Sequence, residues 1–170
     1  MTRFTRRAIV IAALAAAPVL AGAGPALADG AAASRPAVAV DRAAYETEVV
    51  ALTNAQRSWR GCPALRIDDR LTAAAREHSA DMAREGYFDH TGSDGSSFVA
   101  REIEAGYPRR GPSAENIAWG YRTPRDVVTG WMNSAGHRAN ILNCASVAVG
   151  VGLVYRADGT AYWTQDFGRV

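Results

Sequence analysis

The chain has 170 residues, of which 19 are basic and 17 acidic, and every basic residue is Arg. This length fits an export signal followed by about one domain, which is long enough to enclose a hydrophobic core. The absence of Lys excludes Schiff-base and general-base lysine chemistry.

Residues 1–28 have the pattern of a secretory signal peptide. Three Arg residues precede an apolar run from Ala8 to about Leu20, and an Ala-Leu-Ala site ends at Ala28. Pro and Gly interrupt a run that is already too short to favour a membrane span. We expect secretion with cleavage after about Ala28, and no transmembrane segment in the mature chain. The general secretory route is favoured over twin-arginine export through Arg6-Arg7.

Removal of the signal changes the charge balance. The formal net charge is +2, but residues 29–170 carry 16 basic and 17 acidic residues, a net charge of −1. We therefore expect no nucleic-acid partner. Residues 29–40 are small and polar and predict a disordered leader, so the folded domain is expected over residues 41–170, as a monomer.

Two amphipathic helices open the folded part. Asp41 can cap the first, whose apolar residues recur at helical spacing: Tyr45, Val49, Leu52 and Trp59. A short extended piece at residues 65–67 follows. Asp68 or Asp69 then caps a second helix that ends before Gly86, with one apolar face: Leu71, Ala75, His78 and Met82. On that face, His78 is interpreted as a core imidazole bonded to a backbone carbonyl.

Three shorter helices are expected next. Ser96 or Ser97 begins the first of them, with Val99 and Ile103 facing inward. The neighbouring pair Arg109-Arg110 is interpreted as solvated. A Thr-Pro-Arg-Asp start at residues 123–126 predicts another helix, and Ser134 can cap a last one through Leu142.

The C-terminal region predicts a β-hairpin. Apolar residues alternate over 147–155, a turn signal follows at Asp158-Gly159, and a second extended run covers 161–167. Helices around a small sheet favour an α+β sandwich. Cys62 and Cys144, an even pair in an exported chain, are expected to form a disulfide, which contributes about 4–5 kcal/mol by chain-entropy estimates.

Three polar residues stand in unusual settings. His90 lies in a Gly-rich loop, Glu115 lies among apolar residues where a carboxylate needs a partner, and His137 opens a short helix. Two imidazoles and a carboxylate can bind a divalent ion such as zinc and leave a position for water or substrate. Sequence spacing alone does not show that the three residues meet. Serine-hydrolase elbows, zinc-protease helices and nucleotide-binding loops are absent from the sequence.

Six motifs in order resemble the bacterial branch of the CAP superfamily, which includes cysteine-rich secretory proteins, antigen 5 and pathogenesis-related 1 proteins. The motifs are HSADM (78–82), FDHTG (88–92), AENIA (114–118), GWMNSAGHRANIL (130–142), VGVGLVY (149–155) and YWTQDFG (162–168). The resemblance implies an α-β-α sandwich with a central antiparallel sheet flanked by helices. It also implies an open cleft lined by two His and two Glu, which holds a divalent metal in some members.

The resemblance places His90, Glu115 and His137 in that cleft and puts Ser134 where the family has its second Glu. With one carboxylate instead of two, metal binding is expected to be weaker than in the full set, because a Ser hydroxyl is a poor ligand. Ser134 can orient His137 through a hydrogen bond, or serve only as a helix cap. A Ser134–His137 hydrolase dyad is disfavoured, since neither an orienting acid nor a strained elbow is evident nearby.

Three functions remain open at this point. The favoured one is a secreted module that binds a small or extended ligand, namely a lipid, a sterol or a cell-wall fragment, with or without metal. The alternatives are a metal-assisted extracellular hydrolase acting on peptide or another polymer, and a structural or adhesive protein in which the His pair only braces the fold. The resemblance does not choose among them, because fold does not fix function.

Overall fold

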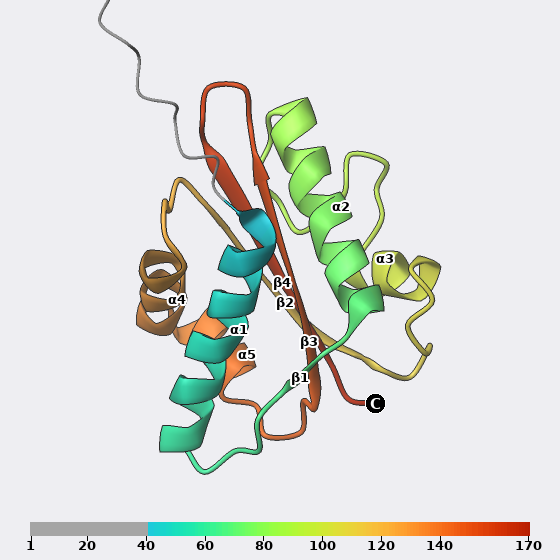
Figure 1. The fold of residues 1–170 in the computed structure, drawn as a ribbon. Coiled ribbons are helices and arrows are strands. Elements are labelled where there is room, and N and C mark those ends of the chain that lie inside the picture. Colours follow the sequence, from blue (N-terminus) through green and yellow to red (C-terminus); the bar gives the residue numbers. More distant parts are fainter. Residues whose placement is uncertain (1–40) are drawn as a thin grey trace, which may run out of the picture. The chain divides into compact units, whose positions relative to one another are not determined.

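The computed structural model describes residues 41–170, so the expected signal peptide and leader lie outside the described residues (Figure 1). A four-stranded sheet in the order β1-β3-β4-β2 lies between two layers of helices (Figure 1). The strands are β1 (Arg66–Ile67), β2 (Pro112–Trp119), β3 (Ala148–Tyr155) and β4 (Ala161–Gly168). The sheet is antiparallel except for the two-residue β1, which runs parallel to β3. The predicted α-β-α sandwich is confirmed.

The helices begin and end close to where capping residues predict. They are α1 (Arg42–Trp59), α2 (Asp69–Glu85), α3 (Phe98–Glu104), α4 (Pro124–Asn133) and α5 (Ala135–Ile141). Side chains of four N-cap residues accept backbone N–H bonds, namely Asp41, Asp68, Ser97 and Thr123. Gly86 ends α2 in the left-handed region with φ of 72°, where a residue without Cβ is favoured. These ends are set by local chemistry, which explains why the sequence predicted them.

The predicted apolar faces of α1 and α3 are wrong at one position each. Trp59 is 90% exposed at the last turn of α1, and the buried residue there is Arg57. In α3, Val99 is exposed while Arg101 and Glu102 are buried. A seven-residue helix shows too few turns for its apolar positions to define a face, so buried charges with tertiary partners decide its orientation.

Helix α2 packs directly against the backbone of β3. A Cβ added at Gly150 would lie 2.1 Å from the Leu71 carbonyl carbon, and one at Gly152 would lie 2.3 Å from the Arg76 nitrogen. Both glycines are therefore required for this close approach. It brings the predicted apolar face of α2 onto the sheet, and His78 is fully buried there.

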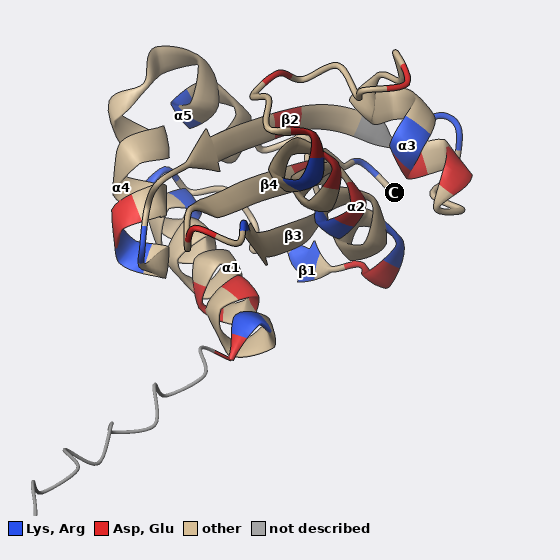
Figure 2. Cartoon of the chain, turned by 90° about the horizontal axis from the view of Figure 1, so that it is seen from above, with Lys and Arg blue, Asp and Glu red and all other residues tan. Residues whose placement is uncertain are grey.

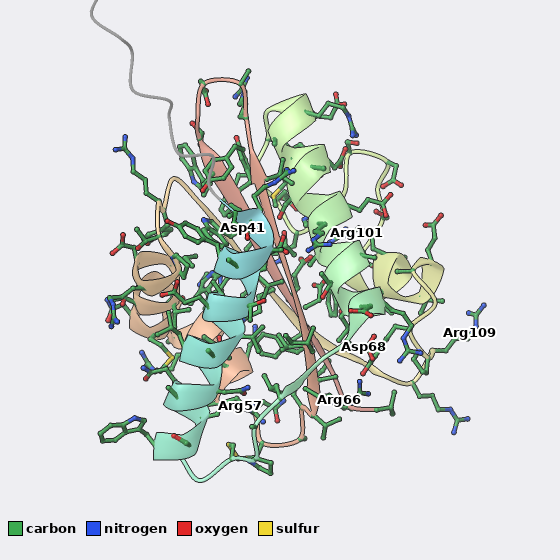
Figure 3. The ribbon with its side chains drawn as sticks, viewed as in Figure 1. Asp41, Arg57, Arg66, Asp68, Arg101 and Arg109 are labelled. Carbon is green, nitrogen blue, oxygen red and sulfur yellow. A yellow bond between two sulfur atoms is a disulfide. The ribbon has the colours of Figure 1, made fainter. Side chains whose placement is uncertain are left out.

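The opposite face of the sheet packs on α1, α4 and α5. Large apolar side chains from these helices and from β3 and β4 fill this core, including Trp131, Ile141, Leu153, Trp163 and Phe167. The buried indole N–H groups are satisfied, since Trp131 donates to the Ile117 carbonyl at 3.1 Å and Trp163 donates to the Tyr121 carbonyl at 2.9 Å. Acidic and basic residues are interspersed over the helices (Figure 2), and Arg109 extends away from the ribbon into solvent, as expected (Figure 3).

The end of α1 is joined to the connection between α5 and β3 in two ways. Cys62 and Cys144 form the predicted disulfide. Beside it, the fully buried guanidinium of Arg57, near the end of α1 (Figure 3), donates to four backbone carbonyls. The acceptors are Pro63 at 3.1 Å, Ile141 at 2.8 Å, Asn143 at 2.9 Å and Ser146 at 2.9 Å. A single side chain thus provides the hydrogen-bond donors for four backbone carbonyls in and beside these loops.

Replacing Arg57 is therefore expected to be strongly destabilising. Because Arg57→Ala leaves several buried carbonyls without donors, and each such loss costs about 1–3 kcal/mol, we expect the free energy of unfolding to fall by about 3 kcal/mol or more. Urea denaturation followed by circular dichroism measures the change. Exposed Arg60 provides the matched control, and Arg60→Ala should stay within about 0.5 kcal/mol of the parent. Equal effects of the two substitutions would contradict the role given to Arg57.

Candidate functional site

The structure brings two of the three expected site residues into direct contact. His90 lies in the loop between α2 and α3, and Glu115 lies on β2. The Nδ1 of His90 is 2.7 Å from Oε1 of Glu115. The Glu115 side chain is 1% exposed and that of His90 is 53% exposed. One ring nitrogen of His90 is thus fixed on a buried carboxylate, while the rest of the imidazole faces solvent.

The charge partner of Glu115 is Arg101, on α3. Its guanidinium donates to Oε2 of Glu115 at 2.6 Å, to the carbonyl of His90 at 3.1 Å and to the carbonyl of Ser96 at 2.9 Å. Arg101 therefore holds both the carboxylate and the loop that carries His90. The sequence indicated that Glu115 needs a partner, but nothing local in the sequence pointed to Arg101.

Two further carboxyl groups, Glu102 and Asp166, are buried close to this ion pair. Asp166 on β4 lies directly opposite Glu115 in the register of the antiparallel pair, where side chains share one face of the sheet. Within residues 41–170, neither carboxyl group has a hydrogen-bond partner. Burial, followed by the charge of Glu115, raises the pKa of Glu102 to about 8 and raises the pKa of Asp166 well above its usual range. Glu102 therefore favours the protonated form at neutral pH, and the pKa of Asp166 is shifted in the same direction.

His78 lies beneath the site as a neutral core residue. Its Nε2 donates to the Asp89 carbonyl at 3.0 Å, which confirms the sequence interpretation. The distance from Nε2 to Oε2 of Glu115 is 3.9 Å, too long for a hydrogen bond. Burial is the main cause that lowers the pKa of His78.

His137 on α5 is held beside β2 by a network of amide side chains. Asn116 donates to the His137 carbonyl at 3.3 Å, and Asn140, three residues along α5, donates to the Glu115 carbonyl at 3.3 Å and to Asn116 Oδ1 at 2.9 Å. Burial, and to a smaller extent the charge of His90, lower the pKa of His137. The two imidazoles thus differ: the hydrogen bond to Glu115 raises the pKa of His90.

Ser134 lies at the junction of α4 and α5. It occupies the predicted N-cap position of α5, but its side chain makes no capping hydrogen bond there. Helix α5 begins instead with the backbone bond from Arg138 N–H to the Ser134 carbonyl at 2.9 Å. The hydroxyl is therefore not committed to the helix end, and a role beside His137 stays a prediction.

The residues present do not form a ready metal centre. Across residues 41–170, no three His, Cys, Asp or Glu side chains are grouped so that they could hold a metal ion. The two oxygens of Glu115 already face His90 and Arg101, so a divalent ion would have to displace a guanidinium from a buried carboxylate. Zinc binding by His90, Glu115 and His137 stays a prediction that these contacts do not favour.

Fold and site together define a single α-β-α sandwich domain with a histidine–carboxylate pair at its surface. Residues 50–167 match the cysteine-rich secretory protein family, CAP, over more than half of the chain. The chain belongs to the CAP family, as its motifs suggested.

Relatives support this assignment over most of the folded part. YkwD of Bacillus subtilis (strain 168) is 45% identical over 126 residues, which cover 73% of this chain and 47% of YkwD. The membrane protein YlbC of the same organism is 34% identical over 122 residues, covering 72% of this chain and 34% of YlbC. The chain thus spans about half or less of the length of these curated relatives.

Solved structures show the same fold. An extracellular protein containing an SCP domain from Bacillus anthracis str. Ames has a TM-score of 0.68 and 30% identity, covering 76% of this chain and 41% of that one. An outer surface protein from Borrelia burgdorferi has a TM-score of 0.69 with 21% identity, covering 76% of this chain and 96% of that one, and it shows the fold alone.

The buried acids predict an unusual pH dependence of stability. Because the pKa of Glu102 is raised to about 8 in the folded state, the folded state binds more protons than the unfolded state between about pH 4.5 and about pH 8. Stability from this group is therefore present at low pH and lost as pH rises through that window. We expect Glu102→Gln to raise the melting temperature at pH 8 and to flatten its decline between pH 5 and pH 8.

Exposed Glu104, on the same helix, provides the control for that measurement. Scanning calorimetry of Glu104→Gln should follow the parent across the window. The pKa of Asp81 is lowered to about 2. The stability that Asp81 contributes therefore changes at lower pH, outside the window in which Glu102 titrates. A Glu102→Gln protein whose melting temperature falls as steeply as the parent's would show that Glu102 does not titrate in this range.

Proposed function

We propose that this CAP-family protein is an extracellular binding module whose His90 and His137 hold an acidic group of a lipid or a cell-wall fragment. The observation that carries the proposal is the position of His90, fixed at 2.7 Å on a buried carboxylate while 53% of its side chain is exposed. An imidazole held in one orientation, with its second nitrogen free, can donate to a ligand without first losing side-chain freedom.

The charges at the site favour an anionic ligand group. Arg101 compensates the charge of Glu115 from the buried side, and the raised pKa of His90 favours its cationic form near neutral pH. A carboxylate or phosphate would form a charge-assisted hydrogen bond with that cation. Among the expected ligands, fatty acids, phospholipids and acidic cell-wall polymers carry such a group and sterols do not.

The openness of the site favours an extended ligand. A cavity of about 680 Å³ in this domain is lined by residues of α1, α2 and β3, and none of His90, Glu115 and His137 belongs to it. A half-exposed His90 can contact a ligand that lies along the surface. A pocket that encloses a small molecule would bury its lining residues more deeply than His90 is buried.

Several observations support an extracellular location. The N-terminal pattern predicts a secretory signal peptide, and the Cys62–Cys144 disulfide is typical of oxidising compartments. The similar SCP-domain protein from Bacillus anthracis is described as extracellular. Among the helices of residues 41–170, none has the length and apolar character needed to cross a membrane.

Substituting both histidines tests the proposal. We expect His90→Ala/His137→Ala to reduce binding to phosphatidylglycerol vesicles and to lipoteichoic acid by about tenfold or more, because the fixed donor is lost. Binding by the parent should weaken as pH rises, because His90, whose pKa is raised by its hydrogen bond to Glu115, then loses its proton. Vesicle co-sedimentation and isothermal titration calorimetry measure both effects.

Two controls separate site binding from general attraction. Arg109→Ala/Arg110→Ala removes two exposed cations away from the site and should leave binding within about threefold of the parent. Phosphatidylcholine vesicles test the need for net negative charge. Equal losses in both double variants, or a large drop in the melting temperature of the His variant, would refute a binding role for the histidines.

The metal question has a separate test. Because Arg101 already neutralises Glu115, we expect no stoichiometric zinc binding by the parent in competition with a chromogenic chelator. Ser134→Glu restores the second family carboxylate and should raise zinc affinity by about tenfold or more, since carboxylate is a far better ligand than hydroxyl. Asn133→Glu, at the adjacent exposed position, is the matched control. One-to-one zinc binding by the parent that His90→Ala abolishes would overturn the metal-independent interpretation.

A further inference from the structure

The outer edge of β3 is only partly covered by another strand. Strand β1 pairs with it at Ala148 and Val149 alone, and within residues 41–170 no strand pairs with that side of β3 beyond these positions. Backbone N–H groups of the β1 segment donate to the carbonyls of Val147 and Val149, both at 3.0 Å. Because backbone groups alternate along a strand, those of Val151, Leu153 and Tyr155 point to the same outer side.

A carboxylate occupies part of this outer edge. The N–H of Leu153 donates to Oε1 of Glu46 on α1 at 2.9 Å, which is where the carbonyl of a neighbouring strand would accept. Arg76 on α2 donates to both oxygens of Glu46, each at 3.1 Å. The Glu46 side chain is 7% exposed, whereas that of Arg76 is 51% exposed. The ion pair therefore covers this edge of β3 from the solvent side. Because Arg76 is half exposed, the pair can move away from the edge into solvent.

Two cavities border this ion pair, and residues of α1 and α2 line both of them. A cavity of about 680 Å³ extends over Leu153 and Val154, and one of about 190 Å³ extends over Val151 and Ile67. Both cavities border the part of β3 that has no partner in β1, and we call the two together the β3-edge groove. The larger cavity alone lies within the usual range for ligand sites.

The charges that line the β3-edge groove are mostly negative. Four carboxylates and two guanidinium groups line it: Asp41, Glu46, Asp69, Glu77, Arg42 and Arg76. Small or apolar residues of α1 form one wall, including Ala43 and Val50. An extended strand presents alternate side chains to opposite sides, so small apolar residues suit the α1 wall and basic residues suit the carboxylates.

We propose that the β3-edge groove binds an extended basic peptide segment of a partner protein as an added strand on β3. The peptide pairs with the outward backbone groups of Val151, Leu153 and Tyr155, and its carbonyl replaces Glu46 at the Leu153 N–H. Main-chain bonds give affinity in this mode of recognition, and the pockets for alternate side chains give specificity. This surface is separate from the His90 site, so either proposal can fail without the other.

The competing interpretation is that Glu46 and Arg76 only protect an edge strand from unwanted pairing. The probe that separates the two is fluorescein-labelled (Lys-Val)₄ amide, measured by fluorescence anisotropy with the mature chain. All Val N–H groups of such a strand point to one edge and all Lys N–H groups to the other. We expect N-methylation of one set to weaken binding by about tenfold or more and methylation of the other set to change it by less than about threefold.

A groove-filling variant has a matched control on the same helix turn. Ala43 lines the groove and its neighbour Ala44 does not, although both are exposed. We expect Ala43→Trp to weaken peptide binding by about tenfold or more, and Ala44→Trp to leave it unchanged with the same circular dichroism spectrum. (Glu-Val)₄ should bind more weakly than (Lys-Val)₄, because the lining is acidic.

Three results would overturn the proposal. The first is no saturable binding of (Lys-Val)₄ by the parent. The second is equal binding of the two N-methylated peptides, or of the Ala43→Trp and Ala44→Trp proteins. The third is a dimer in sedimentation velocity that Ala43→Trp dissociates, which would assign the edge to a second copy of this chain.

Discussion

The site depends on one buried cation, Arg101, which faces three buried carboxyl groups. The Arg101 guanidinium donates a hydrogen bond to Oε2 of Glu115 at 2.6 Å. Little charge compensation therefore remains for Glu102 and Asp166, which have no hydrogen-bond partner within residues 41–170. Three ionised carboxylates around one guanidinium in a buried layer would repel one another strongly. Burial, followed by the charge of Glu115, raises the pKa of both Glu102 and Asp166. Arg101 thus compensates one carboxylate of the three, Glu115, which it contacts directly.

The position of His90 follows from the same pair. Arg101 binds the His90 and Ser96 carbonyls as well as Glu115, so the loop after α2 is attached to β2 through one side chain. Glu115 then fixes Nδ1 of His90, and the amides of Asn116 and Asn140 hold α5 against the same strand. Arg101 thus supports the His90 site from the buried side of Glu115.

The sequence predicted what short-range chemistry decides. The caps at Asp68, Ser97 and Thr123, the left-handed Gly86 and the final hairpin each depend on neighbours within a few residues. It identified Glu115 as a carboxylate in need of a partner. The partner itself lies 14 residues away on a helix whose inward face was predicted as Val99 and Ile103. Asp166 was not recognised either, because its contact with Glu115 depends on the strand register, which no local pattern specifies.

An Arg–Glu ion pair lies at each edge of the sheet, and the two pairs differ in how far their side chains are exposed. At β2 the ion pair is Arg101–Glu115, with side chains 6% and 1% exposed. At β3 it is Arg76–Glu46, with side chains 51% and 7% exposed. Breaking the Arg101–Glu115 pair would leave a buried charge without a partner, which is strongly unfavourable. At the second pair Arg76 already reaches solvent, so Glu46 can turn toward water together with its partner at smaller cost. The β2 edge is therefore a fixed support for His90, and the β3 edge is the one that a partner can open.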